Sequence, residues 1–277
     1  MILKKIVLVA LSNPITSMAN VSKLLNLLDS LNLTVIKSNY LIHNTDILNR
    51  DNQKMAKELI HFLNDTSIDG VFDISGGDLS NSLLPFIDFS LITNSSAKFF
   101  GYSDLTVILN AFIKHTNINI FNYQILNIVK MPIALALFKD AFLENGTSLF
   151  NLNCISLRNN SISPITGIAI GGNIRCFLKL AGTPHMPDLK NKILLLESYS
   201  GNQYKMLTFI NQLLLLKDFS KIKAIVLGNF TEMDNENLSP SIEELFLKLT
   251  DKPLFRTVNL GHNPDSHCIN LGEYLNL

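Results

Sequence analysis

The segment 98–106 (KFFGYSDLT) contains the first candidate for chemistry. Its apolar run ends at Gly101, and Ser103 lies just before an expected helix. A serine hydroxyl at such a strand-to-helix turn occupies the position of a nucleophile elbow, where free N–H groups at the start of the helix stabilise negative charge. The pattern is G-x-S-D rather than G-x-S-x-G, however, and Ser followed by Asp also suits a helix cap. Taken alone, the segment favours capping.

A second segment, 73–80 (DISGGDLS), follows an expected strand and precedes an expected helix. The adjacent Gly76 and Gly77 allow a sharp turn whose N–H groups can hold a phosphate, a carboxylate or a developing oxyanion. The segment lacks the GxGxxG and GxxxxGKS/T spacings, so it does not indicate a nucleotide phosphate loop. A tight turn without further function is an equally good interpretation.

A serine nucleophile requires a base, usually histidine, and the base requires a group that orients it. The six histidines are His43, His61 and His115 in expected surface stretches, His185 in a turn-rich segment, and His262 and His267 in a late irregular segment. Loop residues held by a rigid scaffold often perform catalysis. This favours the last two histidines without choosing between them.

Glu197 is the candidate for the orienting acid. It ends the apolar run 192–197 (KILLLE), which is typical of a buried strand. The carboxyl end of such a strand faces the crevice in which α/β proteins bind ligands. An ordinary exposed glutamate at a strand end is an equally good interpretation of this position alone.

Short Val, Ile, Leu and Phe runs alternate with longer amphipathic stretches in the first half of the chain, as expected when helices cover both faces of a parallel sheet. The expected strands are 6–11, 33–37, 70–74, 98–101, 168–172, 193–197 and 222–227. The expected helices are 17–31, 52–64, 79–86, 105–115, 174–181 and 203–216. The pattern predicts an α/β fold with a doubly wound N-terminal domain and a smaller mixed β/α C-terminal domain.

The pattern weakens over 131–164, where polar Asn and Ser stretches indicate a linker or crossover. We therefore expect an N-terminal α/β domain over 1–130 that contains Ser103. A linker over 131–164 and a C-terminal domain over 165–277, which contains Glu197 and His262, complete the expected organisation.

The composition restricts the class of protein. Lys and Arg number 23, as do Asp and Glu, so the formal net charge is zero and no overall field favours nucleic acid or a membrane surface. The three cysteines are far apart and form no CxxC motif, which argues against a disulfide framework or zinc ribbon and suits a reducing cytoplasm. The apolar run 6–11 is shorter than the signal-peptide core of about 7 to 15 residues. We expect a cytoplasmic protein without a nucleic-acid or membrane partner.

Taken together, these segments resemble the LD-carboxypeptidase and microcin C immunity family of serine peptidases over nearly the full length. The matching motifs, in chain order, are GG at 76–77, SN at 80–81, LLP at 83–85, KFFGYSDLT at 98–106, GGN at 171–173, GTP at 182–184, PD at 187–188, KILLLE at 192–197, GH at 261–262 and G at 272. Each motif is weak alone, but the ordered set is specific.

The resemblance implies a role for each candidate residue. In that family the serine of the GYSD motif is the nucleophile, the glutamate that ends the ILxLE strand orients the base, and the histidine of the late GH motif is the base. These roles fall to Ser103, Glu197 and His262, which places His262 ahead of His267. The resemblance also implies a Rossmann-like N-terminal domain, an active site at the domain interface and a homodimer. Neither a metal nor an organic cofactor is expected.

Backbone and substrate contacts complete the expected site. The N–H groups of Gly77 and Asp104 are expected to receive the oxyanion. Gly76, Asp78 and Asn173 are expected to contact substrate, although each is equally suited to fixing a turn.

Three positions depart from the family pattern. The sequence Asn122-Tyr123-Gln124 replaces a common Tyr-Gly-Pro, Thr208 occupies the place of a usual arginine, and Asn270 lies near the place of a proline before the final glycine. These departures are expected to affect the choice of substrate more than catalysis.

The resemblance implies hydrolysis of an amide bond at the C-terminus of a small peptide, with release of D-alanine from a murein tetrapeptide as the first hypothesis. The alternative is an amidase that cleaves a peptidyl-nucleotide antibiotic. The GGxxSN form of the first motif favours this alternative, whereas the absence of Trp disfavours it unless Tyr or Phe stacks on the base. A non-catalytic peptide-binding protein is the further alternative. A phosphate-binding module is disfavoured by the missing loop motifs and the neutral charge.

Overall fold

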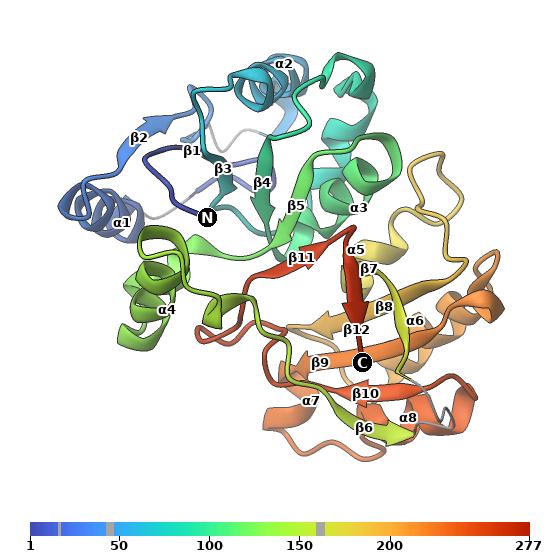
Figure 1. Ribbon diagram of the computed structural model, residues 1–277. Helices are drawn as coiled ribbons and strands as arrows, with labels where there is room; N and C mark the ends of the chain where they lie inside the picture. Colours follow the sequence, from blue (N-terminus) through green and yellow to red (C-terminus); the bar gives the residue numbers. More distant parts are fainter. Residues whose placement is uncertain (16–17, 43–46, 159–163) are drawn as a thin grey trace.

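Two six-stranded β-sheets, each with helices packed on it, form the molecule (Figure 1). The computed structural model describes residues 1–15, 18–42, 47–158 and 164–277. His43 lies outside these ranges. The two sheets confirm the predicted α/β fold with two domains.

The N-terminal sheet has the strand order β11-β5-β4-β3-β1-β2. Its parallel strands are β1 (Lys5–Val9), β2 (Thr34–Lys37), β3 (Gly70–Asp73), β4 (Lys98–Gly101) and β5 (Asn119–Asn122). The edge strand β11 (Ile269–Leu271) comes from the C-terminal part of the chain and is antiparallel to β5. The last part of the chain therefore returns to the N-terminal domain.

Helices cover both faces of this sheet because successive side chains of a strand point to opposite faces. Helices α1 (Met18–Ser30) and α4 (Pro132–Leu143) pack in one hydrophobic core with Leu8, Phe72 and Phe100. Helices α2 (Asn52–Asn64) and α3 (Thr106–His115) pack in another with the neighbouring strand residues, such as Val71 and Phe99. The arrangement is the doubly wound one that the sequence pattern predicts.

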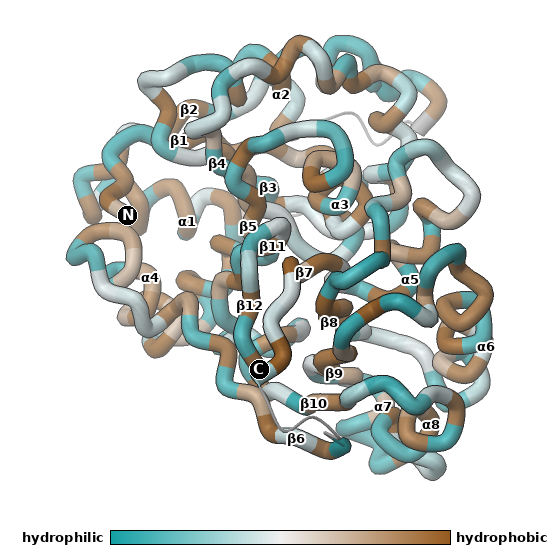
Figure 2. The backbone as a smooth tube through the Cα atoms, turned by 45° about the vertical axis from the view of Figure 1, so that its right-hand side comes forward, coloured by the Kyte–Doolittle hydropathy of each residue, from teal (hydrophilic) through white to brown (hydrophobic). Residues whose placement is uncertain are grey.

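The second sheet has the strand order β12-β7-β8-β9-β10-β6. Its parallel strands are β7 (Thr166–Asn173), β8 (Lys192–Ser198), β9 (Ala224–Phe230) and β10 (Leu254–Arg256), and the antiparallel edge strands are β6 (Ile155–Arg158) and β12 (Tyr274–Asn276). The helices of this domain are α5 (Ile174–Leu178), α6 (Gln203–Leu214), α7 (Thr231–Asn235) and α8 (Ile242–Leu249). Their apolar residues share a core with one face of the sheet. Strands β8 and β9 contain long hydrophobic stretches, whereas many outer turns are hydrophilic (Figure 2).

Helix α3 lies between the two domains and belongs to both. Every residue from Thr106 to Phe112 is buried. Leu109 shares a hydrophobic core with Leu195 of the second sheet, and the Asn110 side chain both donates to Gly171 O (2.8 Å) and accepts from Gly171 N–H (3.0 Å). The chain that follows the Ser103 turn is thus fixed against both sheets.

The segment 131–164 differs from the linker that the sequence indicated, because it contains α4 and β6. The side chains of Phe138 and Phe142 on α4 are fully buried in the N-terminal core. Apolar residues occupy most positions of this helix, so the sequence shows no clear amphipathic period there. The expected helix 79–86 is instead a 3-10 helix over Ser80–Phe86 with Pro85 inside it. Proline removes a backbone donor, which disfavours a regular α-helix at this point.

Candidate active site

Ser103 lies on a strained turn between β4 and α3. Tyr102 is still extended (φ −159°), whereas Ser103 has a positive φ of 54° and begins a 3-10 turn over Ser103–Leu105. Positive φ is uncommon for a residue other than glycine and is often found where function requires a side chain to be presented. Neither the 3-10 turn nor α3 has a side-chain cap. The capping interpretation of Ser103 and Asp104 is therefore wrong.

Three side chains from both domains form a continuous hydrogen-bonded chain. Nδ1 of His262 is 2.6 Å from Glu197 Oε2, and Nε2 of His262 is 3.0 Å from Ser103 Oγ. An ionised carboxylate only accepts, so Nδ1–H donates to Glu197 and Nε2 is left to accept from the Ser103 hydroxyl. Glu197 is the next-to-last residue of β8 and is only 1% exposed. The arrangement can activate a serine oxygen for attack on a carbonyl carbon.

Two tyrosine rings fix the position of His262. The ring centroids of Tyr102 and Tyr199 lie 4.6 and 5.0 Å from that of the imidazole. The Tyr102 hydroxyl also donates to Gly261 O at 3.0 Å, which joins the loop of His262 to the turn of Ser103. Burial raises the pKa of Tyr102 well above its usual value, so this hydroxyl stays protonated and remains a donor.

The other described histidines lie outside this chain of contacts. Nδ1 of His267 is 2.7 Å from Asn151 O, and its Nε2 is 3.2 Å from Asn259 Nδ2. Nδ1 of His185 lies 3.2 Å from Nε2 of His115, and burial lowers the pKa of both side chains. His61 is exposed on α2.

Gly77 and Asp104 offer backbone N–H groups beside Ser103. Gly77 has φ 133°, and a Cβ built there would lie 2.1 Å from Asn13 Cγ, so only glycine fits. Gly76 O accepts from Asn13 N–H (3.2 Å), and Asp78 N–H donates to Asn13 Oδ1 (2.9 Å). In the described part of the chain, neither Gly77 N–H nor Asp104 N–H has a recorded protein acceptor.

The Asp104 side chain, unlike its backbone N–H group, forms several polar contacts with the protein. It is fully buried and forms an ion pair with Lys179 (2.6 Å), and it accepts from Ser12 Oγ (2.6 Å) and Ser80 N–H (2.8 Å). Burial opposes ionisation, but the hydrogen bonds from Lys179, Ser12 and Ser80 outweigh it and lower the pKa of Asp104. The carboxylate thus fastens the nucleophile turn to the second domain.

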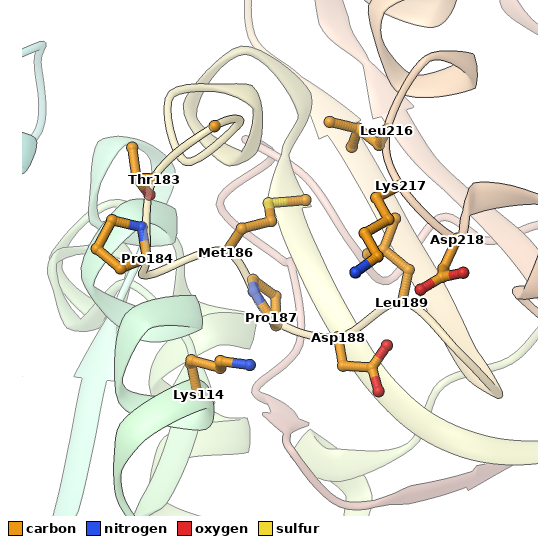
Figure 3. Close-up of a pocket in the computed structure, with 11 residues that line it drawn as sticks. Lys114, Thr183, Pro184, Met186, Pro187, Asp188, Leu189, Leu216, Lys217 and Asp218 are labelled. Atoms are coloured by element: carbon orange, nitrogen blue, oxygen red, sulfur yellow. The ribbon is translucent and has the colours of Figure 1, made fainter.

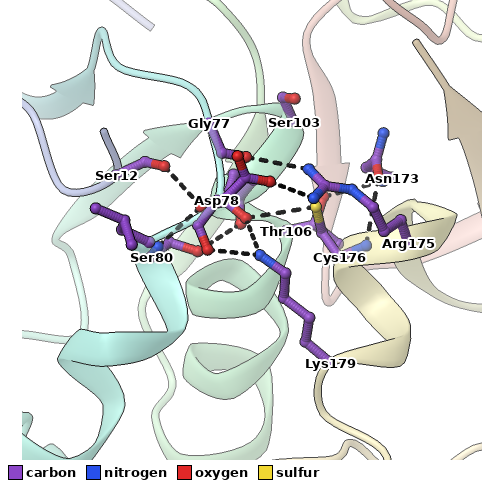
Figure 4. Close-up of polar contacts among 12 residues, drawn as sticks. Ser12, Gly77, Asp78, Ser80, Ser103, Thr106, Asn173, Arg175, Cys176 and Lys179 are labelled. Carbon is purple, nitrogen blue, oxygen red and sulfur yellow. Dashed lines mark hydrogen bonds and ion pairs between the residues drawn. The ribbon is translucent and has the colours of Figure 1, made fainter. Parts of the chain in front are cut away.

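Two cations of the second domain hold the Gly77 loop (Figure 4). Arg175 donates to Gly77 O at 3.1 Å and forms an ion pair with Asp78. Lys179 donates to Asp78 O at 2.8 Å. Sequence reasoning identified neither cation, because a lone Arg or Lys close to a GGN motif has no distinctive spacing.

A cavity of about 490 Å³ opens over Ser103 and His262. It is lined by Gly77, Asp78, Ser103, Asn173, Arg175, Ser198, Tyr199, Ser200, Lys205 and His262. Of the expected substrate contacts, Asp78 and Asn173 line it, but Gly76 does not. The Asn173 side chain caps α5 by accepting from Cys176 N–H (3.3 Å).

The departures from the family pattern lie away from this cavity. Tyr123 is buried in the N-terminal core, between Asn122 and Gln124. Thr208 is exposed on α6 and donates to Tyr204 O (3.0 Å), and Asn270 lies on β11. None of them lines the cavity over Ser103.

A second cavity, of about 600 Å³, lies between the end of α3, the segment 182–189 and the residues after α6 (Figure 3). Lys114 and Lys217 line it, together with Met186 and Leu216. It contains no serine or histidine, so it offers no nucleophile and base. The smaller cavity over Ser103 is therefore the candidate active site.

The described residues limit two other interpretations. No helix among them is long and apolar enough to cross a membrane. No group of three or more of their His, Cys, Asp and Glu side chains is placed to hold a metal ion.

The fold and the site define a two-domain α/β protein with a Ser-His-Glu contact chain at the domain interface. Its sequence matches the model of the LD-carboxypeptidase N-terminal domain over residues 6–123 and that of the LD-carboxypeptidase C-terminal domain over residues 166–277. The chain belongs to the LD-carboxypeptidase family.

Individual relatives agree with this family. A putative carboxypeptidase of Treponema pallidum (strain Nichols) is 29% identical over 223 residues, which cover 70% of this chain and 65% of the relative. A probable murein peptide carboxypeptidase of Bacillus subtilis (strain 168) is 25% identical over 242 residues, or 80% of this chain and 72% of the relative. Among solved structures, the microcin C7 self immunity protein MccF in complex with aspartyl sulfamoyl adenosine superimposes with a TM-score of 0.82 at 19% identity, covering 100% of this chain and 93% of that one.

Proposed function

We propose that the protein is a serine carboxypeptidase in which Ser103 is the nucleophile, His262 the base and Glu197 the group that orients the base. The observation that supports this most directly is the chain of contacts from the Glu197 carboxylate through both ring nitrogens of His262 to the Ser103 hydroxyl. Family membership supports the same class of enzyme.

In the proposed reaction, His262 Nε2 takes the proton of Ser103 as Oγ attacks the carbonyl carbon of the terminal amide. The proton then passes to the leaving amine nitrogen, the C–N bond breaks, and the remaining peptide is held as an ester on Ser103. Water gives a proton to His262 and attacks the ester, which releases the shortened peptide and restores the hydroxyl. Glu197 holds the imidazole tautomer and stabilises the imidazolium that forms twice in this cycle.

The N–H groups of Gly77 and Asp104 are proposed to receive the oxyanion. Gly77 lines the cavity, and Asp104 follows Ser103 in its 3-10 turn. Neither N–H group has a protein acceptor in the described part of the chain. A donor aimed at a developing oxyanion typically lowers the barrier by about 3 to 4 kcal/mol.

The proposed substrate is a murein tetrapeptide that loses its terminal D-alanine. The cavity volume of about 490 Å³ lies within the range of about 300 to 1,000 Å³ typical of small-ligand sites. The naming of one relative as a probable murein peptide carboxypeptidase supports this substrate class.

The test is D-alanine release from murein tetrapeptide by wild type and by Ser103→Ala. We expect release by the wild type and loss of at least about 1,000-fold of kcat in the variant, because the acyl intermediate cannot form. A serine-directed phosphonate should label the wild type and not Ser103→Ala. Equal turnover by the two proteins would contradict the proposal, and an unlabelled, inactive wild type would favour a peptide-binding protein that performs no catalysis.

A peptidyl-nucleotide is the second candidate substrate. Tyr199 lines the cavity and is 61% exposed, so its ring can stack on a base. Cleavage of a peptidyl-nucleotide amide, without cleavage of the tetrapeptide, would select this alternative. Replacing Tyr199 by Ala should then weaken binding of the nucleotide substrate, whereas Tyr199→Phe should preserve it.

A cytoplasmic location and a homodimer complete the proposal. The three cysteines are free thiols, and Cys176 and Cys268 are buried, which fits a reducing compartment. The homodimer rests on the family resemblance. Light scattering should give twice the 31.0 kDa mass of the chain, and a value near 31.0 kDa would contradict it.

A further inference from the structure

The cavity over Ser103 has an uneven distribution of charge. Among the described residues, those that line it with a formal charge, other than the histidine, are Asp78, Arg175 and Lys205. Asp78 and Arg175 form an ion pair and so largely neutralise one another. Lys205 donates through its backbone N–H to Asn202, but its ammonium group has no acceptor within the described part of the chain. Lys205 is therefore the lining cation whose side chain pairs with no acidic residue of the described part of the chain, since the other nearby carboxylate, that of Glu197, contacts His262.

Arg175 also retains capacity for a ligand. A guanidinium has five N–H donors. Arg175 donates through Nη1 to Asp78 and through Nη2 to Gly77 O, and its Nε has no acceptor among the described residues. The Arg175–Asp78 pair is partly exposed, with side-chain exposures of 42% and 61%, and exposed pairs of this kind contribute little stability. An incoming anion can therefore share the guanidinium at small energetic cost.

A peptide that loses only its last residue has its anion close to the scissile bond. The terminal carboxylate is one residue beyond the carbonyl that Ser103 would attack, so it must enter the same cavity. An uncharged cavity would leave that carboxylate without a partner after it loses water, which is costly. A cation in the lining compensates for this cost and discriminates against peptides that continue beyond the next residue.

We propose that Lys205, assisted by Arg175, binds the free terminal carboxylate of the substrate and thereby restricts cleavage to the last residue. This inference rests on the proposed function for its position in the reaction, but the binding it describes can be measured without turnover. Lys205 is the specificity residue to test, because Arg175 also holds the Gly77 loop and its replacement would disturb two features at once.

The experiment compares the murein tetrapeptide with the same peptide ending in D-alaninamide. Wild type should prefer the free acid, and Lys205→Met should lower this preference by at least about tenfold, the factor that a hydrogen bond to a charged group is typically worth. The loss should appear mainly in KM, and Lys205→Arg should restore much of it. Lys23→Met, at an exposed position of α1, is the matched control and should leave the preference unchanged.

Binding of both peptides to Ser103→Ala, measured by calorimetry with and without Lys205→Met, separates this inference from the proposed function. If Ser103→Ala binds the free acid more tightly than the amide, and Lys205→Met removes this preference, the inference is supported even if wild type hydrolyses neither peptide. A preference that survives Lys205→Met, an equal loss for acid and amide, or no preference in the first place would overturn it.

Discussion

Lys179→Met is predicted to destabilise the protein by about 3 kcal/mol, because it leaves the Asp104 carboxylate without its cation. The Asp104 side chain is fully buried, Lys179 is one-fifth exposed, and the two charges are 2.6 Å apart. Removing one partner of a buried ion pair costs about 3 to 5 kcal/mol. The lower end applies here, because Ser12 and Ser80 still donate to the other carboxylate oxygen.

Reversible urea unfolding at pH 7 measures this change in the free energy of unfolding. With an m-value of about 3 kcal/mol per molar urea, the midpoint should fall by about 1 M. Lys23→Met is the control for the loss of an exposed lysine and should leave the midpoint in place. The double variant Asp104→Asn/Lys179→Met should be more stable than Lys179→Met, because it removes the unpaired charge as well as its partner.

The pH dependence gives the result that would refute this reasoning. The contacts of Asp104 lower its pKa in the folded protein, so its ionised form contributes stability above the unfolded value near 4 and loses it as the pH falls through the folded value. The stability difference between wild type and Lys179→Met should therefore shrink below about pH 4. A destabilisation below about 1 kcal/mol at pH 7 would show that the pair contributes little to stability. A larger one that stays constant to low pH would show that Lys179 acts through something other than the Asp104 charge, and either result would refute the reasoning.

Two further predictions concern Gly77, in the loop beside Ser103, and Asp73, the last residue of β3. Gly77→Ala should lower kcat by about 100-fold or more. The φ of 133° and the Asn13 side chain leave no room for a Cβ, so the loop would shift and displace the proposed oxyanion donor, the N–H group of residue 77. A kcat within a few-fold of wild type in steady-state kinetics would contradict this. Burial raises the pKa of Asp73 to about 7, so the folded protein binds more protons than the unfolded chain from about pH 4 to 7. The contribution of this group to the free energy of unfolding should therefore decrease as the pH rises through that range, and Asp73→Asn should abolish this slope in urea unfolding measured at several pH values.

The three residues of the contact chain could be named from the sequence because each lies in or beside a recognisable local pattern. Ser103 comes two residues after β4, Glu197 lies near the carboxyl end of β8, and His262 belongs to a glycine-containing loop. Position alone left capping open for the serine and could not choose between His262 and His267. The resemblance to the family favoured the nucleophile role for Ser103 and placed His262 ahead of His267. In the fold, His262 lies within hydrogen-bond distance of Glu197, 65 positions before it, and of Ser103, 159 positions before it.

The polar contacts that hold the site were beyond sequence reasoning. Lys179 contacts Asp104, which lies 75 positions earlier in the sequence, and Arg175 contacts Gly77, which lies 98 positions earlier. No helical or strand periodicity in the sequence relates residues so far apart. Helix α4 was missed for a different reason, since its apolar residues continue around most of the helix. A stretch of that kind gives no amphipathic signal by which to recognise it.

The path of the chain explains why the site depends on both domains. Glu197 lies near the carboxyl end of β8 in the second sheet, and the His262 loop leads into β11, which pairs with β5 of the first sheet. Tyr102 immediately precedes Ser103, and its hydroxyl donates to Gly261 O, one residue before His262, at 3.0 Å. The loop of the proposed base is therefore fastened to the segment of the proposed nucleophile, while its Nδ1 is fastened to the second sheet. Because α3 packs against both sheets as well, a shift of one domain against the other would have to break the Ser-His-Glu contacts and the shared core together.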